Sequence, residues 1–149
     1  MNDLTPYRVA PDKAIGLIPL AVGWLTAARP FHTGSVSPDF VNKLRAFCQP
    51  GYTILPPKGA RWDGRCPLDK SCSRQLLTIP DGDDLIYLDN AEIRVIGDDD
   101  IFAAPTMIYH YVTAHQYKPP EAFVMGVLRG PSAGSPEHRA LVRALQNAP

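Results

Sequence analysis

The 149-residue sequence lacks an excess of charge of either sign, because fifteen acidic residues balance fifteen basic ones. A general nucleic-acid binder draws its affinity from an excess of Lys and Arg, so this composition argues against a nucleic-acid partner. Long apolar runs are also missing. The most apolar segment, residues 14–28, is shorter than a membrane span and contains Gly and Pro. We therefore expect neither nucleic acid nor membrane as a partner.

Cysteine is scarce. The three cysteines are an odd number, which excludes complete internal pairing. Few cysteines and the lack of a clear export signal favour the reducing cytoplasm. The sequence also contains no nucleophile elbow, Walker or dinucleotide-binding pattern. The aspartate runs at 81–84 and 98–100 lack the ligand spacing of a calcium loop. These absences favour a non-catalytic role over an enzyme.

Proline, in contrast, is abundant, with sixteen residues, about twice the average share. Proline fixes φ and removes a backbone donor, so we expect short elements joined by rigid, irregular connections. A chain of this length fits one domain, residues 1–149. Within it we expect a surface arm over 1–13, an irregular basic loop over 50–74 and a peripheral C-terminal helix over 131–149.

The clearest predicted helix begins after Ser37. Ser37 is a favourable N-cap, and Pro38 suits the first helical position. The apolar side chains that follow recur with helical periodicity and share one face: Phe40, Val41, Leu44, Phe47 and Cys48. Cys48 lies on this stripe and is therefore expected to be a packed thiol.

The second half of the chain predicts a hairpin followed by two helices. Ile93 and Val95 share one face of a strand, and residues 97–100 can form the turn into the next strand. Helical patterns begin at Pro105 and Pro120, and their short connection makes the helices neighbours. The sequence therefore predicts an α+β fold, in which a small antiparallel sheet packs with one helix from the N-terminal half and with this C-terminal helical pair.

Charge is segregated along the chain. Five basic residues, Lys58, Arg61, Arg65, Lys70 and Arg74, precede a strongly acidic stretch from 81 to 100. One interpretation is a pair of solvated loops that partly neutralise each other. The other is an interaction protein of immunity or accessory type, monomeric or homodimeric, that uses Lys58, Arg61 and Arg65 to bind an acidic protein partner.

Cys66 and Cys72 are the candidate metal ligands, although five residues separate them and a zinc knuckle usually has two to four. Zinc binding, a disulfide and two free thiols all remain open for this pair, and no other cofactor is expected. His110 and His115 would point about 140° apart on one helix, so we expect them not to bind one ion unless the helix ends between them.

The two histidines have different expected roles. His115 falls on the apolar stripe of its helix, which predicts a hydrogen-bonded histidine in the core. His110 faces away from that stripe. It is therefore the better candidate for a partner contact, or for the functional imidazole if the protein is a small enzyme.

Several segments resemble a family of small, uncharacterised bacterial proteins. The most specific are Ala91-Glu-Ile-Arg-Val-Ile-Gly97 and the stretch that runs Ala-Ala-Pro-Thr-Met-Ile-Tyr-His-Tyr-Val-Thr-Ala-His-Gln-Tyr-Lys-Pro-Pro-Glu-Ala-Phe over residues 103–123. Val22-Gly-Trp-Leu25 and Pro30-Phe-His-Thr-Gly34 are similar as well. The resemblance covers residues 22–129. It implies a compact fold and a bacterial origin, but no activity.

Members of that family often carry a Gly-x-His-x-Cys-x-x-Cys knuckle before the strand, which implies metal binding. When Cys66 is matched to the first cysteine of the knuckle, Gly64 stands in place of the His and Asp69 in place of the second Cys. The resemblance therefore implies a metal site that is degenerate in this chain.

Overall fold

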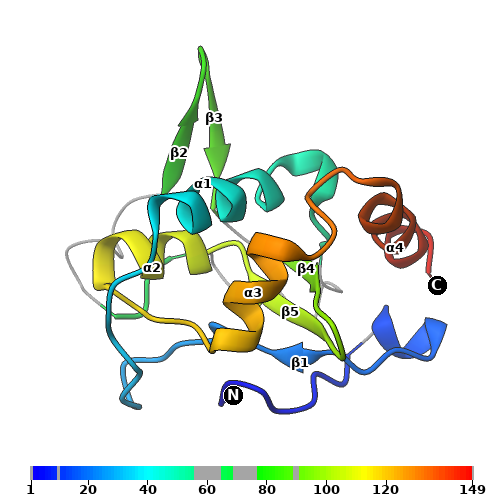
Figure 1. The fold of residues 1–149 in the computed structure, drawn as a ribbon, viewed down its shortest axis with the longest axis horizontal. Helices are drawn as coiled ribbons and strands as arrows, with labels where there is room; N and C mark the ends of the chain where they lie inside the picture. Colours follow the sequence, from blue (N-terminus) through cyan, green and yellow to red (C-terminus); the bar gives the residue numbers. More distant parts are fainter. Residues whose placement is uncertain (1, 10, 56–64, 69–76, 89–90, 149) are drawn as a thin grey trace.

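A computed structural model describes residues 2–9, 11–55, 65–68, 77–88 and 91–148. Its helices and strands, in chain order, are η1 (Asp12–Ile15), β1 (Leu20–Ala21), α1 (Pro38–Phe47), η2 (Pro50–Tyr52), β2 (Thr78–Asp81), β3 (Asp84–Tyr87), β4 (Glu92–Ile96), β5 (Ile101–Pro105), α2 (Ile108–His115), α3 (Glu121–Arg129) and α4 (Pro136–Gln146). The described residues form an α+β fold, as predicted (Figure 1).

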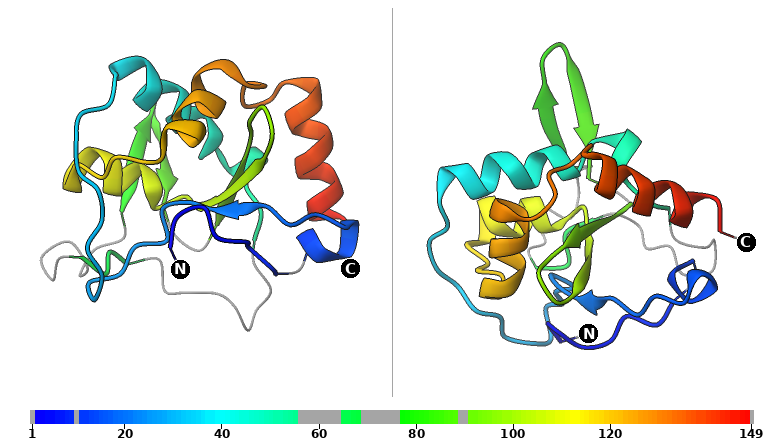
Figure 2. Two further views of the ribbon diagram at one scale, coloured as in Figure 1. Left: turned by 60° about the horizontal axis from the view of Figure 1, so that its bottom comes forward. Right: turned by 45° about the vertical axis from the view of Figure 1, so that its right-hand side comes forward.

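The strands form two small sheets. The first has the order β1-β5-β4, and its antiparallel β4–β5 hairpin pairs Ile93 with Ala104 and Val95 with Phe102. The short strand β1 adds to β5 in parallel. The second sheet is the β2–β3 hairpin, which projects from the body of the molecule (Figures 1 and 2). The predicted antiparallel sheet is therefore confirmed, with a parallel strand added at one edge.

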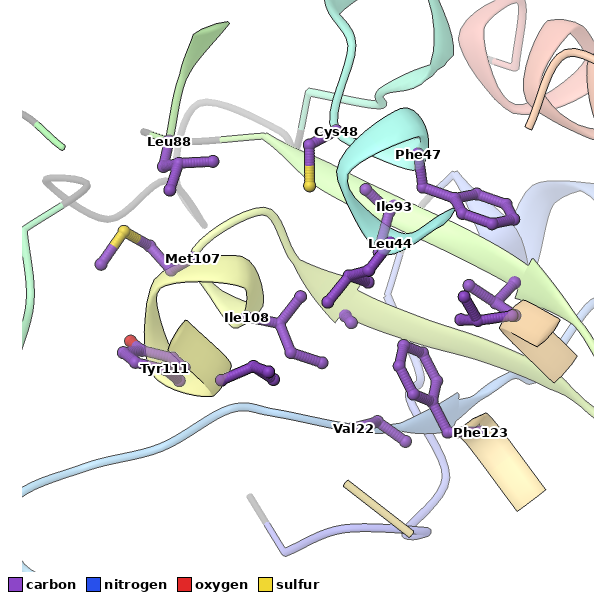
Figure 3. Close-up of a cluster of buried hydrophobic side chains, with 14 of the residues drawn as sticks. Val22, Leu44, Phe47, Cys48, Leu88, Ile93, Met107, Ile108, Tyr111 and Phe123 are labelled. Atoms are coloured by element: carbon purple, nitrogen blue, oxygen red, sulfur yellow. The ribbon is translucent and has the colours of Figure 1, made fainter. Parts of the chain in front are cut away.

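Helices α1, α2 and α3 form the core with the β4–β5 hairpin. α1 packs against α2 and α3, and α3 packs against β4. Figure 3 shows the buried side chains that meet between these elements. The buried residues of this core include Phe40, Leu44, Phe47, Ile93, Val95, Ile108, Phe123 and Val127. The helix start predicted at Ser37 is confirmed, because its Oγ accepts a hydrogen bond from Phe40 N–H at 3.1 Å.

The opposite face of β4 carries charged residues, which the N-terminal segment covers. The Nε–H group of Arg94 donates a hydrogen bond to Asp12 Oδ1 at 2.9 Å, and its Nη2–H group donates one to Asp12 Oδ2 at 2.6 Å. Its Nη1–H group donates a hydrogen bond to Glu92 Oε1 at 2.9 Å, and the Tyr7 hydroxyl donates one to Glu92 Oε2 at 2.6 Å. Buried charges require such partners. The expectation of a surface arm over 1–13 is therefore wrong at Tyr7 and Asp12, which are buried.

The predicted loop and C-terminal helix are described in part. Of residues 50–74, the structure describes 50–55, which contain η2, and 65–68. The C-terminal helix is α4, which begins after Ser135 and packs against β4 and η1. α4 buries His138, Val142 and Leu145, so it is docked on the domain.

Candidate metal centre

Three potential metal ligands converge beside α2. The Cys66 sulfur and one ring nitrogen each from His110 and His115 lie within 4.8 Å of one another. Cys66 Sγ is 3.4 Å from His115 Nε2, and the two imidazole centroids are 5.0 Å apart. The thiol comes from residues 65–68 and both imidazoles come from α2. Tertiary folding therefore creates the cluster.

The end of α2 explains why the two imidazoles meet. His115 is the last residue of the helix, and Gln116 adopts a left-handed conformation with φ of +57°. Tyr117 N–H then donates to Tyr111 O at 3.0 Å, which closes the helix. Because no further helical turn follows His115, its ring can swing toward His110. The expectation that these histidines point apart is therefore wrong.

The burial of the cluster favours neutral imidazole ligands. Burial lowers the pKa of His110, and the neighbouring His115 lowers it further. His110 Nε2 is buried and has no hydrogen-bond partner among the described residues. A buried polar atom without a partner costs free energy, which a bound cation would recover. Metals bind the neutral form of imidazole, so the lowered pKa suits His110 to ligation.

The distances fit a tetrahedral metal after a small movement. Zinc bonds of about 2.3 Å to sulfur and about 2.0 Å to nitrogen, at tetrahedral angles, place two donors about 3.5 Å apart. The Cys66–His115 distance of 3.4 Å matches this value. All three donor atoms lie within 4.8 Å of one another, so the third donor, the His110 nitrogen, must move by no more than about 1 Å to reach a bonding position. One thiolate and two imidazoles are a donor set that zinc accepts.

The sequence-predicted site residues are only partly brought together. Cys66 and His110 lie in the cluster, while Arg65 is an exposed neighbour of Cys66. Cys72, Lys58 and Arg61 lie outside the described residues. Metal ligation by Cys72 together with Cys66, a disulfide between them, and the partner-binding role of Lys58, Arg61 and Arg65 therefore stay predictions.

His115 is the site residue that sequence reasoning missed. Its place on the apolar stripe assigned it to the core, and no local motif connects it to Cys66, 49 residues earlier. The available signal was the Tyr-His-Tyr-Val-Thr-Ala-His segment at 109–115, which contains both histidines and carries the family resemblance.

Cys48 provides a contrast with Cys66. It is buried in the core among apolar side chains (Figure 3), and its sulfur contacts Thr106 O at 3.9 Å. Burial raises the pKa of the Cys48 thiol to about 12. The predicted role of Cys48 as a packed thiol is therefore confirmed.

Together, the fold and the cluster define a small α+β domain with a cysteine–histidine metal-ligand set. The chain belongs to the family described as Domain of unknown function (DUF7919), whose profile matches residues 1–128. No curated protein and no solved structure matches the chain. Among the residues that the structure describes, none of the helices has the length and apolar character needed to cross a membrane.

Proposed function

We propose that this domain is a zinc-binding module in which Cys66, His110 and His115 hold the metal. The observation that carries the proposal is the convergence of one thiol and two imidazoles from separate parts of the chain. Three protein ligands leave a fourth position of a tetrahedral site for another donor. Cys72 is the sequence-based candidate for that position.

The role that fits the burial of this cluster is structural. Cys66 is only 1% exposed, and His110 and His115 are intermediate in exposure. A metal held there would join residues 65–68 to α2, which packs into the core through Ile108 and Val112. Because the unfolded chain does not present the ligands together, the binding free energy of the metal would add to the stability of the fold.

A small enzyme is the competing interpretation of the same atoms. A thiol 3.4 Å from an imidazole also resembles a cysteine nucleophile beside its general base. A nucleophile must meet a substrate, however, and reactive cysteines are at least partly exposed. The 1% exposure of Cys66 favours a ligand over a nucleophile.

Metal analysis of the purified protein tests the proposal. We expect about one zinc per chain after expression with zinc, and loss of that zinc in Cys66→Ser, His110→Gln and His115→Gln. Cys48→Ala and His32→Gln are matched controls that change a cysteine and a histidine outside the cluster, and both should keep the metal. Less than about a tenth of an equivalent in the unchanged protein would sink the proposal.

Cobalt substitution identifies the ligands directly. Cobalt(II) bound to a thiolate gives a sulfur-to-metal charge-transfer band, and tetrahedral coordination gives intense d–d bands in the visible range. We expect both features in the unchanged protein. The charge-transfer band should vanish in Cys66→Ser if Cys66 supplies the only thiolate, and should halve if Cys72 is a second ligand.

Binding of an acidic protein partner remains compatible with this module. Arg65 is exposed and directly precedes Cys66, so a metal that fixes Cys66 would also fix the position of Arg65. A bacterial, cytoplasmic setting, as inferred from the motifs and the scarce cysteines, would keep the thiol reduced and available to the metal. Pull-down with Arg65→Glu, in zinc-loaded protein, tests whether this arginine contributes to a partner surface.

A further inference from the structure

We propose that α4 is a pH-sensitive cover over β4, which is released when His138 takes up a proton. The observations lie on the opposite side of the molecule from α2, which carries two of the proposed metal ligands, and do not depend on them (Figure 1). α4 packs against β4, the edge strand of the three-stranded sheet, and against η1 (Figure 2). Release of α4 would therefore expose the part of β4 that this helix covers.

The imidazole of His138 is enclosed by aromatic rings. His138 is 0% exposed, and its ring centroid lies 5.0 Å from that of Phe47 and 5.7 Å from that of Tyr52, both in edge-to-face geometry. Phe47 belongs to α1 and Tyr52 to η2. The imidazole therefore anchors the first turn of α4 to two other elements.

The hydrogen bonding of His138 requires the neutral ring. Gly134 N–H donates to Nδ1 at 3.1 Å, so the ring proton of neutral His138 must be on Nε2. Nε2 is buried and has no hydrogen-bond partner in the described part of the chain. Protonation would place a second N–H on Nδ1, directly against the Gly134 donor. It would thus replace a hydrogen bond with a repulsive contact.

No described carboxylate pairs with His138 to stabilise its charged form. β4 contributes Glu92 and Arg94, and η1 contributes Asp12 and Lys13, but Arg94 already binds both acids. α4 itself carries Glu137 and Arg139, whose side chains are exposed, whereas α1 and η2 present uncharged Phe47 and Tyr52. Burial accordingly lowers the pKa of His138, which the backbone of Arg94 opposes only in part.

α4 has few other attachments. Of its eleven residues, only His138, Val142 and Leu145 are buried. Gln146 adds one hydrogen bond, from Nε2 to Thr53 O at 3.0 Å. A charge on His138 would therefore weaken the packing of one of the three buried side chains that attach α4 to the domain, and only Val142, Leu145 and the Gln146 hydrogen bond would remain. Release of α4 would uncover the part of β4 that it covers, beside the edge position at which Ile54 already pairs with Glu92.

Hydrogen exchange followed by mass spectrometry on the zinc-supplied full chain tests this cover. After correction for intrinsic exchange rates, we expect the protection of α4 amides to fall at least about tenfold between about pH 7.5 and about pH 5. Protection of α3 should not change over the same range. Uniform loss across α3 and α4 would indicate global unfolding and would overturn the proposal, as would constant protection of α4.

His138→Asn is the matched variant, because its side-chain oxygen can accept from Gly134 N–H but does not titrate. The smaller side chain lowers α4 protection at every pH, yet the pH-dependent step should disappear. His32→Asn, at an exposed histidine, should keep the step. A step that persists in His138→Asn would refute the role of this imidazole.

NMR titration of the unchanged protein gives a readout that needs no variant. The ring signals of His138 should titrate with the same midpoint as the loss of α4 protection. Midpoints that differ by more than about one pH unit would contradict the coupling.

Discussion

Cys66 Sγ and His115 Nε2 lie 3.4 Å apart although 49 residues separate them in the chain. This distance is what a shared tetrahedral metal would impose on sulfur and nitrogen ligands. His110, which precedes His115 by five residues on α2, supplies the third donor atom of this group. A single ion at this place would connect residues 65–68 to the helix that packs against α1.

Removal of zinc should therefore lower the thermal stability of the domain. If free zinc is present at about a thousand times its dissociation constant, binding contributes about 4 kcal/mol. For a domain of this size, that free energy corresponds to a shift in Tm on the order of 10 °C. Calorimetry with and without a chelator measures it. The chelator should have no effect on Cys66→Ser, and an equal shift in that variant would show that the chelator acts elsewhere.

Arg94 should be among the most sensitive positions in the chain. It is 0% exposed and binds both Asp12 and Glu92, so Arg94→Met would leave two buried carboxylates without their cation. Breaking a buried pair in this way costs about 3–5 kcal/mol. Arg45→Met is the matched control, because the Arg45–Asp81 pair is partly exposed to solvent and its loss should cost less than about 1 kcal/mol. Similar losses of unfolding free energy in both variants would contradict this account of Arg94.

The Asp12–Arg94 contact also shows why part of the fold escaped prediction. The hairpin and the helices that follow it were predictable because their periodicity is a local signal, although the helix expected to begin at Pro105 begins at Ile108 and Pro105 ends β5. The burial of the N-terminal segment was not, since it depends on a β4 arginine that lies 82 residues away from Asp12. A sequence that starts with polar residues and prolines resembles a surface arm until its buried partner is known.

The candidate site was predictable to a similar extent. Cys66 and His110 could be singled out because thiol and imidazole side chains are chemically distinctive. His115 could not be assigned to the same site, because helical spacing alone separates it from His110. Only the helix end at Gln116 and the tertiary approach of residues 65–68 bring the three side chains together.

Glu92 should make stability depend on pH in a direction opposite to an ordinary ion-paired acid. Burial raises its pKa, while Arg94 and the Tyr7 hydroxyl lower it only in part. A raised folded-state pKa means that the folded protein binds the proton more tightly than the unfolded chain. The contribution of Glu92 is therefore fully present below the ordinary glutamate pKa and is lost as the pH rises through the raised value.

Denaturant titrations between about pH 4 and pH 8 check this sign. Glu92→Gln resembles the protonated side chain, so the free energy of unfolding of this variant should depend less on pH. The variant should therefore be least destabilised, relative to the unchanged protein, at the upper end of the pH range. Asp84→Asn, at an exposed acid in β3, is the control and should leave the pH dependence as it is. A steeper dependence in Glu92→Gln would refute the direction assigned to this group.

The two described cysteines should differ in reactivity in a way that reports on the metal. Cys66 would be blocked by its ion in the loaded protein and should be alkylated faster when a chelator is added, because loss of the ion would release residues 65–68 from α2 and let the buried thiol reach the solvent. Cys48 should resist in both states, since burial raises its pKa to about 12 and it sits in the core. Peptide mass spectrometry after timed alkylation distinguishes the two sites, and denaturant added at the end should make Cys48 react. Equal labelling of Cys66 with and without the chelator would mean that no metal protects it, while early labelling of Cys48 would mean that the core opens before the site does.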